Sequence, residues 1–421
     1  MSLNHETPTQ PSPDHQPTRT MAALCGVLAG ALGLGLAELI AGLVPGAPSP
    51  VLSIGALLIS LQPPGAKDFV VNIFGTYDKL ALSVAVAIGA LVLSALIGLL
   101  ARRSLLAGRL AFGALGLFAL FAAWQDPLFD RVLAVATAAV AIAVSAWSLG
   151  WLLQLATPRT PEAPRMMDFE RRRFLGAAVG VGAAAVTSGL IGRTLLNQQS
   201  AAAAELPPIP APQATAAPLP AGSELAVDGI TPLVVPNRDF YRIDTSLLTP
   251  HRDASTWTLT VNGMVDHPFT INYDELLAMP LVEQYVTIAC VSNKVGGDLV
   301  GNALWRGARL RDLLDRAGVQ AGATQLVGRD FGGWTAGFPT AWLDVADREP
   351  MVAVAMNGEP LPPEHGYPAR LIVPGLYGYV SATKWLSALE LTRFDTFEGF
   401  WVPRGWAPRA PVLTQTRIDV P

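Results

Sequence analysis

Cysteine and clustered basic charge are scarce in this chain of 421 residues. Its two cysteines, Cys25 and Cys290, are too few to form a disulfide framework. The formal net charge is −4 and no run of lysines and arginines exceeds three residues, so we expect no nucleic-acid partner. The sequence also lacks the G-x-S-x-G and H-E-x-x-H motifs, which are typical of serine hydrolases and zinc peptidases.

Histidine is scarce too, and its distribution limits the metal sites that the chain can form. His5 and His15 lie in the polar start of the chain, so the apolar N-terminal half contains none. A b-type haem held by two axial histidines is therefore excluded from that half. The remaining histidines do not form a closely spaced zinc motif with Cys290, and they are His251, His267 and His365.

Apolar residues are abundant instead. The hydrophobic fraction of 51% and the mean hydropathy of +0.38 exceed what an ordinary soluble domain shows, so part of the chain is expected in a membrane. We predict a disordered tail over residues 1–20 and a membrane domain of about four transmembrane helices over residues 21–157. The candidate spans are 21–44, 80–100, 110–124 and 132–155, and the shorter run 51–61 predicts a re-entrant or interfacial segment.

Arginine placement predicts the topology. Arg102, Arg103 and Arg109 lie between the second and third spans, which places that loop in the cytoplasm. Residues 158–196 are then a cytoplasmic loop, a twin-arginine-like motif at 171–175 and a fifth transmembrane helix. A plain basic cluster flanking a helix explains the same arginines equally well. The protein is expected to be a multi-pass cell-membrane protein whose C-terminal domain is extracytoplasmic.

The remainder of the chain divides into an Ala/Pro-rich linker, 197–224, and a domain over 225–421. The linker composition predicts a semi-extended segment that is not packed. In the domain, alternation predicts strands at 257–263 and 282–290, and a helix at 310–317 should end at Gly318. Further strands are expected at 352–356 and 370–374, and a helical turn at 273–279, with 357–368 as a loop. The fold class is α+β.

Cys290 ends one of these strand patterns, before a glycine-bearing loop. A single thiolate suits a soft transition metal whose other ligands come from an organic cofactor, and this interpretation requires an exposed thiol at a strand end. A buried structural cysteine is an equally good interpretation. A cysteine hydrolase pairing Cys290 with His365 is a third possibility.

Several blocks between residues 236 and 392 resemble, in order, the molybdopterin-binding domain of the sulfite oxidase family. They are "PNRDFYRIDT", "WTLTVNGMV", "TIACVSNK", "WRGARLRDLLDRAGV" and "VAMNGEPLPPEHGYPARLIVPGLYGYVSATKWL". The resemblance implies a helical transmembrane anchor plus an α+β sulfite-oxidase-type molybdopterin-binding domain. It also implies a Mo-molybdopterin cofactor and an oxidoreductase that transfers oxygen atoms.

The resemblance further implies site residues. Cys290 would ligate molybdenum, and Arg242 and Cys290 would be catalytic. An anionic pterin phosphate suits an arginine fork, a lysine and backbone N–H groups. The cofactor-binding residues implied are Asp239, Tyr241, Arg242, Ile243, Asn293, Lys294, His365, Arg370, Ser381, Thr383 and Lys384.

Two departures from the family leave the substrate open. Val295 and two glycines stand where animal-type sulfite oxidases place a substrate-binding arginine, and Trp334 or Thr335 stands near the position of their active-site tyrosine. Both a sulfite oxidase-like and a sulfoxide reductase-like reaction are therefore retained. The expected partners are a small-molecule substrate and a separate redox partner, either a haem protein or quinone-linked. The alternatives are a cofactor-free binding module and a cysteine hydrolase.

Overall fold

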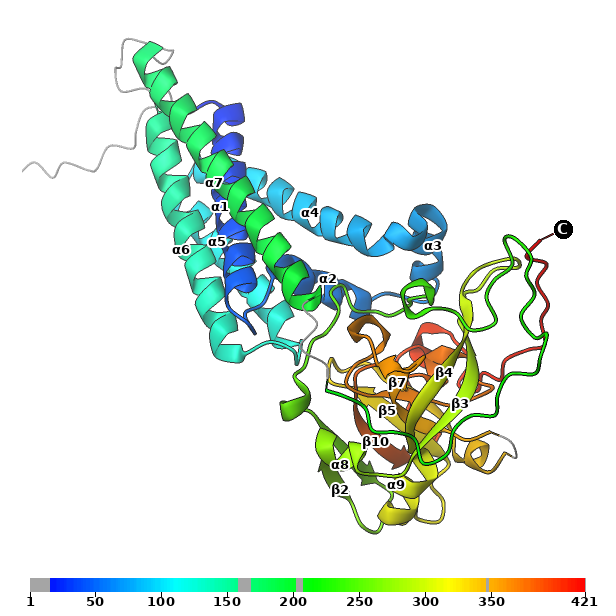
Figure 1. Ribbon diagram of the computed structural model, residues 1–421. Helices are drawn as coiled ribbons and strands as arrows, with labels where there is room; N and C mark the ends of the chain where they lie inside the picture. Colours follow the sequence, from blue (N-terminus) through cyan, green and yellow to red (C-terminus); the bar gives the residue numbers. More distant parts are fainter. Residues whose placement is uncertain (1–15, 158–167, 202–206, 346–347, 421) are drawn as a thin grey trace, which may run out of the picture. The chain divides into compact units, whose positions relative to one another are not determined.

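The computed structural model describes residues 16–157, 168–201, 207–345 and 348–420 (Figure 1). The predicted disordered tail up to residue 15 and the predicted cytoplasmic loop up to residue 167 therefore lie outside the described residues. Two compact units are present. One comprises Met1–Leu61 and Val70–Gln199, and the other comprises Gln62–Phe69 and Ser200–Pro421.

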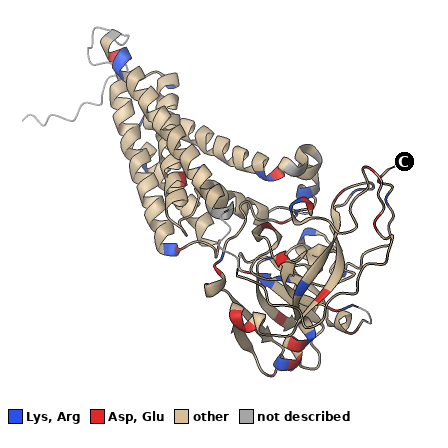
Figure 2. Ribbon diagram, viewed as in Figure 1, with Lys and Arg blue, Asp and Glu red and all other residues tan. Residues whose placement is uncertain are grey.

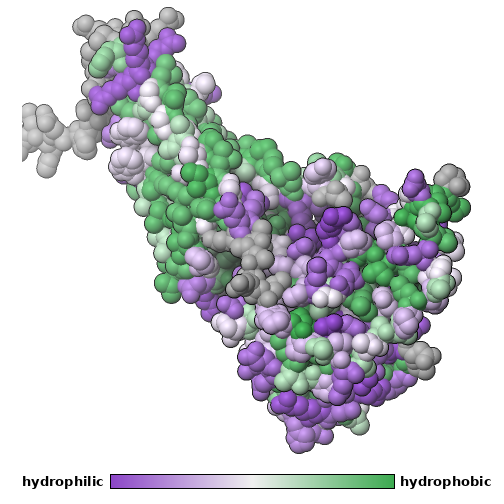
Figure 3. All heavy atoms as spheres, in the orientation of Figure 1, coloured by the Kyte–Doolittle hydropathy of each residue, from purple (hydrophilic) through white to green (hydrophobic). Residues whose placement is uncertain are grey.

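The first unit is helical. Among the described residues, five helices are long and apolar enough to cross a membrane, as the sequence predicts. Figures 2 and 3 show these helices almost free of charged residues and covered with hydrophobic ones. The helices of this region are α1 (Arg19–Leu43), α2 (Pro50–Ser60), α3 (Ala66–Phe74), α4 (Asp78–Ala101), α5 (Leu105–Trp124), α6 (Arg131–Ala156) and α7 (Asp168–Ala201). The twin-arginine-like motif lies in the first turns of α7.

Small residues let these helices approach closely. A Cβ atom added at Gly26 of α1 would lie 2.1 Å from the carbonyl oxygen of Ser94 in α4. One added at Gly42 would lie 2.5 Å from the carbonyl oxygen of Gly192 in α7. Contacts this short need glycine, because any side chain would separate the backbones. The glycine-rich composition of the apolar runs therefore sets the packing of α1.

The second unit contains two five-stranded sheets. The first has the order β2-β1-β10-β5-β6, in which β1 and β10 are parallel, and the second has the order β3-β4-β7-β8 with β9 beside β7. The strands are β1 (Thr258–Gly263), β2 (Phe269–Asn272), β3 (Leu281–Ala289), β4 (Val300–Arg309), β5 (Gln325–Asp330), β6 (Thr335–Pro339), β7 (Met351–Met356), β8 (Glu359–Pro360), β9 (Arg370–Ile372) and β10 (Leu386–Thr392). Short helices α8 (Tyr273–Leu277), α9 (Leu310–Ala317) and α10 (Gly378–Ser381) connect them.

Local sequence rules explain most of these elements. Leu259 and Val261 of β1 are fully buried, as the alternation predicts. Helix α9 ends at Gly318, whose φ of 68° is the left-handed conformation that favours glycine. The predicted strands, helix and helical turn are all confirmed. The fold class of this unit is α+β, as expected.

Two expectations need correction. Part of the linker is packed, because Gln213 donates to the carbonyl oxygen of Leu281 at 2.7 Å and Ala214 accepts from Glu283 at 2.9 Å. These bonds use the free edge of β3, whose backbone groups would otherwise lack protein partners. In addition, the predicted loop 357–368 contains the short strand β8 and a 3-10 turn at Pro363–His365.

Candidate functional site

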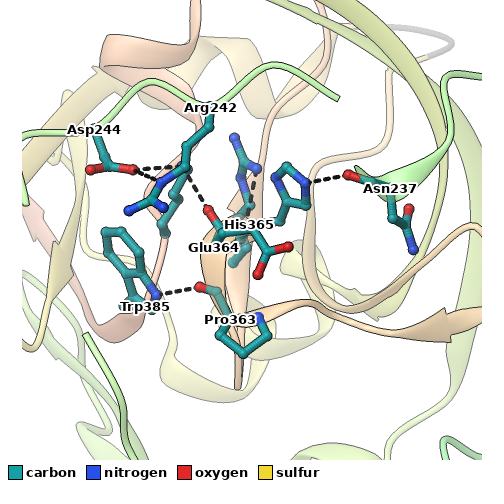
Figure 4. Close-up of polar contacts among 9 residues, drawn as sticks. Asn237, Arg242, Asp244, Pro363, Glu364, His365 and Trp385 are labelled. Atoms are coloured by element: carbon teal, nitrogen blue, oxygen red, sulfur yellow. Dashed lines mark hydrogen bonds and ion pairs between the residues drawn. The ribbon is translucent and has the colours of Figure 1, made fainter. Parts of the chain in front are cut away.

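A buried carboxylate joins two cations from distant parts of the second unit. Oδ2 of Asp244 lies 3.1 Å from Nε of Arg242 (Figure 4) and 3.1 Å from Nζ of Lys384. Lys384 also donates to the carbonyl oxygen of Glu364 at 2.9 Å. The side chains of Asp244 and Lys384 are 6% and 7% exposed, whereas that of Arg242 is 38% exposed. Arg242 is thus the more accessible cation of the group.

Burial makes Lys384 easy to deprotonate. It lowers the pKa of Lys384 to about 8, an effect that Asp244 opposes by stabilising the ammonium form. The next residue, Trp385, has a φ of 52°, a left-handed conformation that costs a bulky residue about 1 kcal/mol or more. Its indole Nε1 donates to the carbonyl oxygen of Pro363 at 2.8 Å, which fixes the turn after Lys384 (Figure 4).

His365 lies beside this group on the 3-10 turn Pro363–His365. Its Nε2 lies 2.7 Å from the carbonyl oxygen of Asn237 (Figure 4). Its ring meets that of Phe240 edge-on, with centroids 5.6 Å apart. Burial lowers the pKa of His365 to about 4, so the ring is neutral at pH 7. Because a carbonyl oxygen only accepts, Nε2 carries the proton and Nδ1 is left as an acceptor.

Arg370 begins β9 and is buried beneath His365. Its Nη1 donates to the carbonyl oxygen of His365 at 3.2 Å, and its guanidinium carbon lies 5.2 Å from the ring centroid of Trp305. Burial lowers the pKa of Arg370 to about 10, so it remains a cation at pH 7. Neither the ring of Trp305 nor the carbonyl oxygen of His365 carries a negative charge that would neutralise Arg370. A buried cation in such surroundings favours an anionic ligand.

Cys290 follows β3 directly. The position at a strand end is confirmed, but the expected exposure is wrong, since Cys290 is only 9% exposed. Its backbone N–H donates to the carbonyl oxygen of Leu299 at 2.9 Å, which closes the loop between β3 and β4. Tyr241 connects this thiol with Arg370: burial raises the pKa of Tyr241, Arg370 lowers it and Cys290 raises it. Tyr241 therefore lies close enough to both Arg370 and Cys290 to be influenced by each of them.

The other residues implied by the resemblance have partners of their own. Asp239 pairs with exposed Arg238 at 3.3 Å, and the hydroxyl of Ser381 donates to the carbonyl oxygens of Leu376 and Tyr377. Asn293 accepts from the backbone N–H of Leu299 at 2.9 Å, which stabilises the Cys290 loop. Lys294 lies on that loop, and Ile243 is 39% exposed beside Arg242.

Residue patterns alone did not identify Asp244, Asn237 and Trp305 as members of this group. Asp244 follows Arg242 by two residues, and an acid so close to a proposed anion-binding arginine was a usable signal. Asn237 contributes a backbone carbonyl, which any residue could supply. Trp305 lies in β4, whose alternating pattern is typical of a strand that packs in a core. Their roles depend on long-range contacts.

Within the part of the chain that the structure describes, three buried polar atoms in this group have no hydrogen-bond partner: Nδ1 of His365, Nε of Arg370 and Oγ1 of Thr383. An unpaired buried polar atom costs about 1–3 kcal/mol, so several in one place indicate a polar ligand that satisfies them. Thr383 is packed tightly as well, because a Cβ atom at Gly328 would lie 2.5 Å from its Oγ1. The donors and cations fit a large anionic cofactor such as a pterin phosphate.

Comparison with known proteins agrees with this chemistry. Residues 246–401 match the family described as the oxidoreductase molybdopterin binding domain. The oxidoreductase YuiH of Bacillus subtilis is 36% identical over 159 residues, which cover 38% of this chain and 76% of YuiH. The chain belongs to the molybdopterin-binding oxidoreductase family. Mo-molybdopterin is therefore its cofactor, and the resemblance to the sulfite oxidase family is confirmed.

Further relatives of this molybdopterin oxidoreductase are larger proteins. A nitrate reductase of Oryza sativa is 34% identical, over 35% of this chain and 19% of the relative. Human mitochondrial sulfite oxidase is 28% identical, over 44% of this chain and 38% of the relative. The solved structure of the sulfane dehydrogenase SoxCD from Paracoccus pantotrophus shares 26% identity over 39% of this chain and 44% of its own, with a TM-score of 0.35. The matched range 246–401 begins after Arg242.

Proposed function

We propose that this protein is a membrane-anchored molybdopterin oxidoreductase that transfers oxygen atoms to or from a small-molecule substrate. The observation that supports this most directly is the set of unpartnered buried atoms on His365, Arg370 and Thr383, together with the buried cation Lys384. Removing an oxygen atom from a substrate consumes two electrons and two protons and releases water, and adding one reverses that balance. The bound molybdenum cofactor would supply this two-electron oxygen chemistry.

The protein's own residues would bind and orient. Arg370 and Lys384 would neutralise the anionic part of the cofactor, and neutral His365 would accept a hydrogen bond at Nδ1. Cys290 would supply one thiolate to the metal from its buried position at the end of β3. Arg242, the most exposed cation of the group, would steer a polar substrate.

The remaining parts of the proposal concern location and partners. The apolar helices support an anchor in the cell membrane, and arginine placement supports an extracytoplasmic catalytic domain. The twin-arginine-like motif at the start of α7 is in keeping with export of a domain that has already bound its cofactor. Electrons would pass to or from a separate haem or quinone-linked partner, since the apolar half contains no histidine.

The first experiment measures metal and pterin in the full-length protein purified from a molybdate-supplied host. A redox-dye assay then compares sulfite with sulfoxides and N-oxides as substrates. Molybdenum, pterin and turnover of one of these substrates are expected. A metal-free protein whose Cys290 reacts with a hydrolase-directed probe would instead favour the cysteine hydrolase, and a metal-free, unreactive protein would favour a binding module.

Cys290→Ser tests the metal-ligand role. The variant should retain pterin, because the phosphate-binding cations are unchanged, and should lose turnover by several orders of magnitude. Cys25→Ser is the matched control, because Cys25 is buried in α1 of the other unit and should leave turnover unchanged. Turnover in the Cys290→Ser variant at the wild-type rate would contradict the assignment.

A further inference from the structure

The C-terminal segment 410–420 runs beside several loops of the candidate site, and we call it the C-terminal strap. It lies beyond the residues that match the family, 246–401. At its start, the backbone N–H of Tyr377 donates to the carbonyl oxygen of Ala410 at 2.8 Å, and that of Val412 donates to Gly375 at 3.0 Å. These bonds join the strap to the chain just before α10 and Lys384.

Arg417 fixes the other end of the strap. Its Nη1 donates to the carbonyl oxygen of Gly297 at 2.7 Å, and its Nη2 donates to Oγ1 of Thr231 at 2.5 Å. Its Nε pairs with Asp419, whose Oδ2 in turn accepts from the backbone N–H of Thr231 at 2.9 Å. The Arg417 side chain is 23% exposed. Bonds on three nitrogens hold the guanidinium plane in one orientation.

Gly297 belongs to the loop that follows Cys290, residues 291–299. The loop is closed at its base, where Cys290 donates to the carbonyl oxygen of Leu299, and Asn293 accepts from Leu299 at 2.9 Å. Its tip lies in solvent, since Val295 is fully exposed. Gly297 also packs on Asn293, because a Cβ atom there would lie 2.5 Å from Oδ1 of Asn293. A displacement of Gly297 would therefore also displace Asn293, whose hydrogen bond with Leu299 stabilises the base of the loop.

We propose that Arg417 is a positioning residue, which holds the loop after Cys290 so that the thiol keeps its buried place at the end of β3. The carbonyl of Gly297 is the point of attachment, and Thr231 and Asp419 orient the guanidinium toward it. Its importance for turnover rests on the proposed function. Its effect on the Cys290 thiol is a property of the chain itself, and so it is testable in protein that lacks the cofactor.

The experiment measures the alkylation rate of Cys290 by iodoacetamide in full-length, cofactor-free protein, followed by peptide mass spectrometry. Arg417→Ala should raise the rate about tenfold, the change expected when the hydrogen bond from the charged guanidinium to the carbonyl oxygen of Gly297 is lost. Arg417→Lys should restore most of the protection, since lysine can still donate to Gly297. Cys25, which is fully buried in the other unit, should stay unmodified in every variant and so reports that the variants remain folded.

Arg393→Ala is the matched control. Arg393 also pairs with an aspartate two residues later, Asp395, on the surface of the same unit. It should leave the Cys290 rate unchanged. An equal rise in Arg393→Ala and Arg417→Ala, or no rise in Arg417→Ala, would overturn the proposal.

Asp419→Asn provides a second variant if Arg417→Ala does not fold, and it should raise the rate by a smaller factor because only the orientation of Arg417 is lost. An unchanged rate in that variant counts against the proposal. Failure of the proposed function would appear differently, as a wild-type protein without molybdenum or pterin, whatever the alkylation rates.

Discussion

Replacing Asp244 with asparagine tests the electrostatics of the candidate site. The change removes the charge that faces Lys384 at 3.1 Å, where both side chains are at most 7% exposed. Breaking a buried ion pair from one side costs about 3–5 kcal/mol. Lys384 limits this cost by losing its proton, since its pKa is already lowered to about 8 and falls further without Asp244. We expect a loss of about 2–3 kcal/mol in the free energy of unfolding at pH 7.

The cost should shrink as the pH rises through 8. Above that pH the wild-type Lys384 is itself largely neutral, so Asp244 no longer stabilises the Lys384 cation, and the variant loses mainly the pair with the partly exposed Arg242 and a hydrogen bond. The assay is thermal unfolding of the cofactor-free, full-length protein at pH 7 and pH 9. A shift of about 5–10 °C is expected at pH 7 for a unit of this size, and about half of that or less at pH 9.

Asp344→Asn is the control for this measurement. Asp344 pairs with Arg311 at 3.3 Å, but the two side chains are 77% and 52% exposed, and exposed pairs contribute about 0–1 kcal/mol. Equal shifts for the two variants at pH 7, or an Asp244→Asn shift that is the same at both pH values, would refute the reasoning.

Two further predictions concern the buried group around the cofactor. His365 has a pKa lowered from 6.5 to about 4, so the unfolded chain takes up a proton below pH 6.5 that the folded protein does not. Between pH 6.5 and 4 the free energy of unfolding of the wild-type protein, measured in urea, should fall by about 3 kcal/mol through this group. That of His365→Gln should fall by less, and equal losses in the two proteins would contradict this. Gly328→Ala should destabilise the domain by about 1–3 kcal/mol and lower pterin content, because its Cβ would meet Thr383. Gly89→Ala is the control, because Gly89 has open space around it. An unchanged pterin content in Gly328→Ala would contradict a role for Thr383 in binding the cofactor.

The sequence predicted the elements of the catalytic unit well and its electrostatics poorly. Helix α9 was identified from its apolar face and from Gly318, and both signals lie within a few residues of each other. The packing of linker residues Gln213 and Ala214 on β3 left no such local signal, because an edge strand accepts almost any backbone. The exposure of Cys290 was wrongly predicted for a similar reason, since burial depends on the segments that fold over a strand end.

The sequence by itself determined the apolar helices, the α+β class and the order of blocks that identifies the molybdopterin domain. The helices and the fold class follow from hydrophobic length, periodicity and capping, which act over one or two turns of chain, whereas the domain was identified by the resemblance of its blocks to the sulfite oxidase family. Only the tertiary structure decided that Asp244 neutralises Lys384, 140 residues away, and that Asn237 holds His365, 128 residues away. Such contacts depend on how the two sheets bring distant loops together, and the pKa values of the site depend on the burial that results.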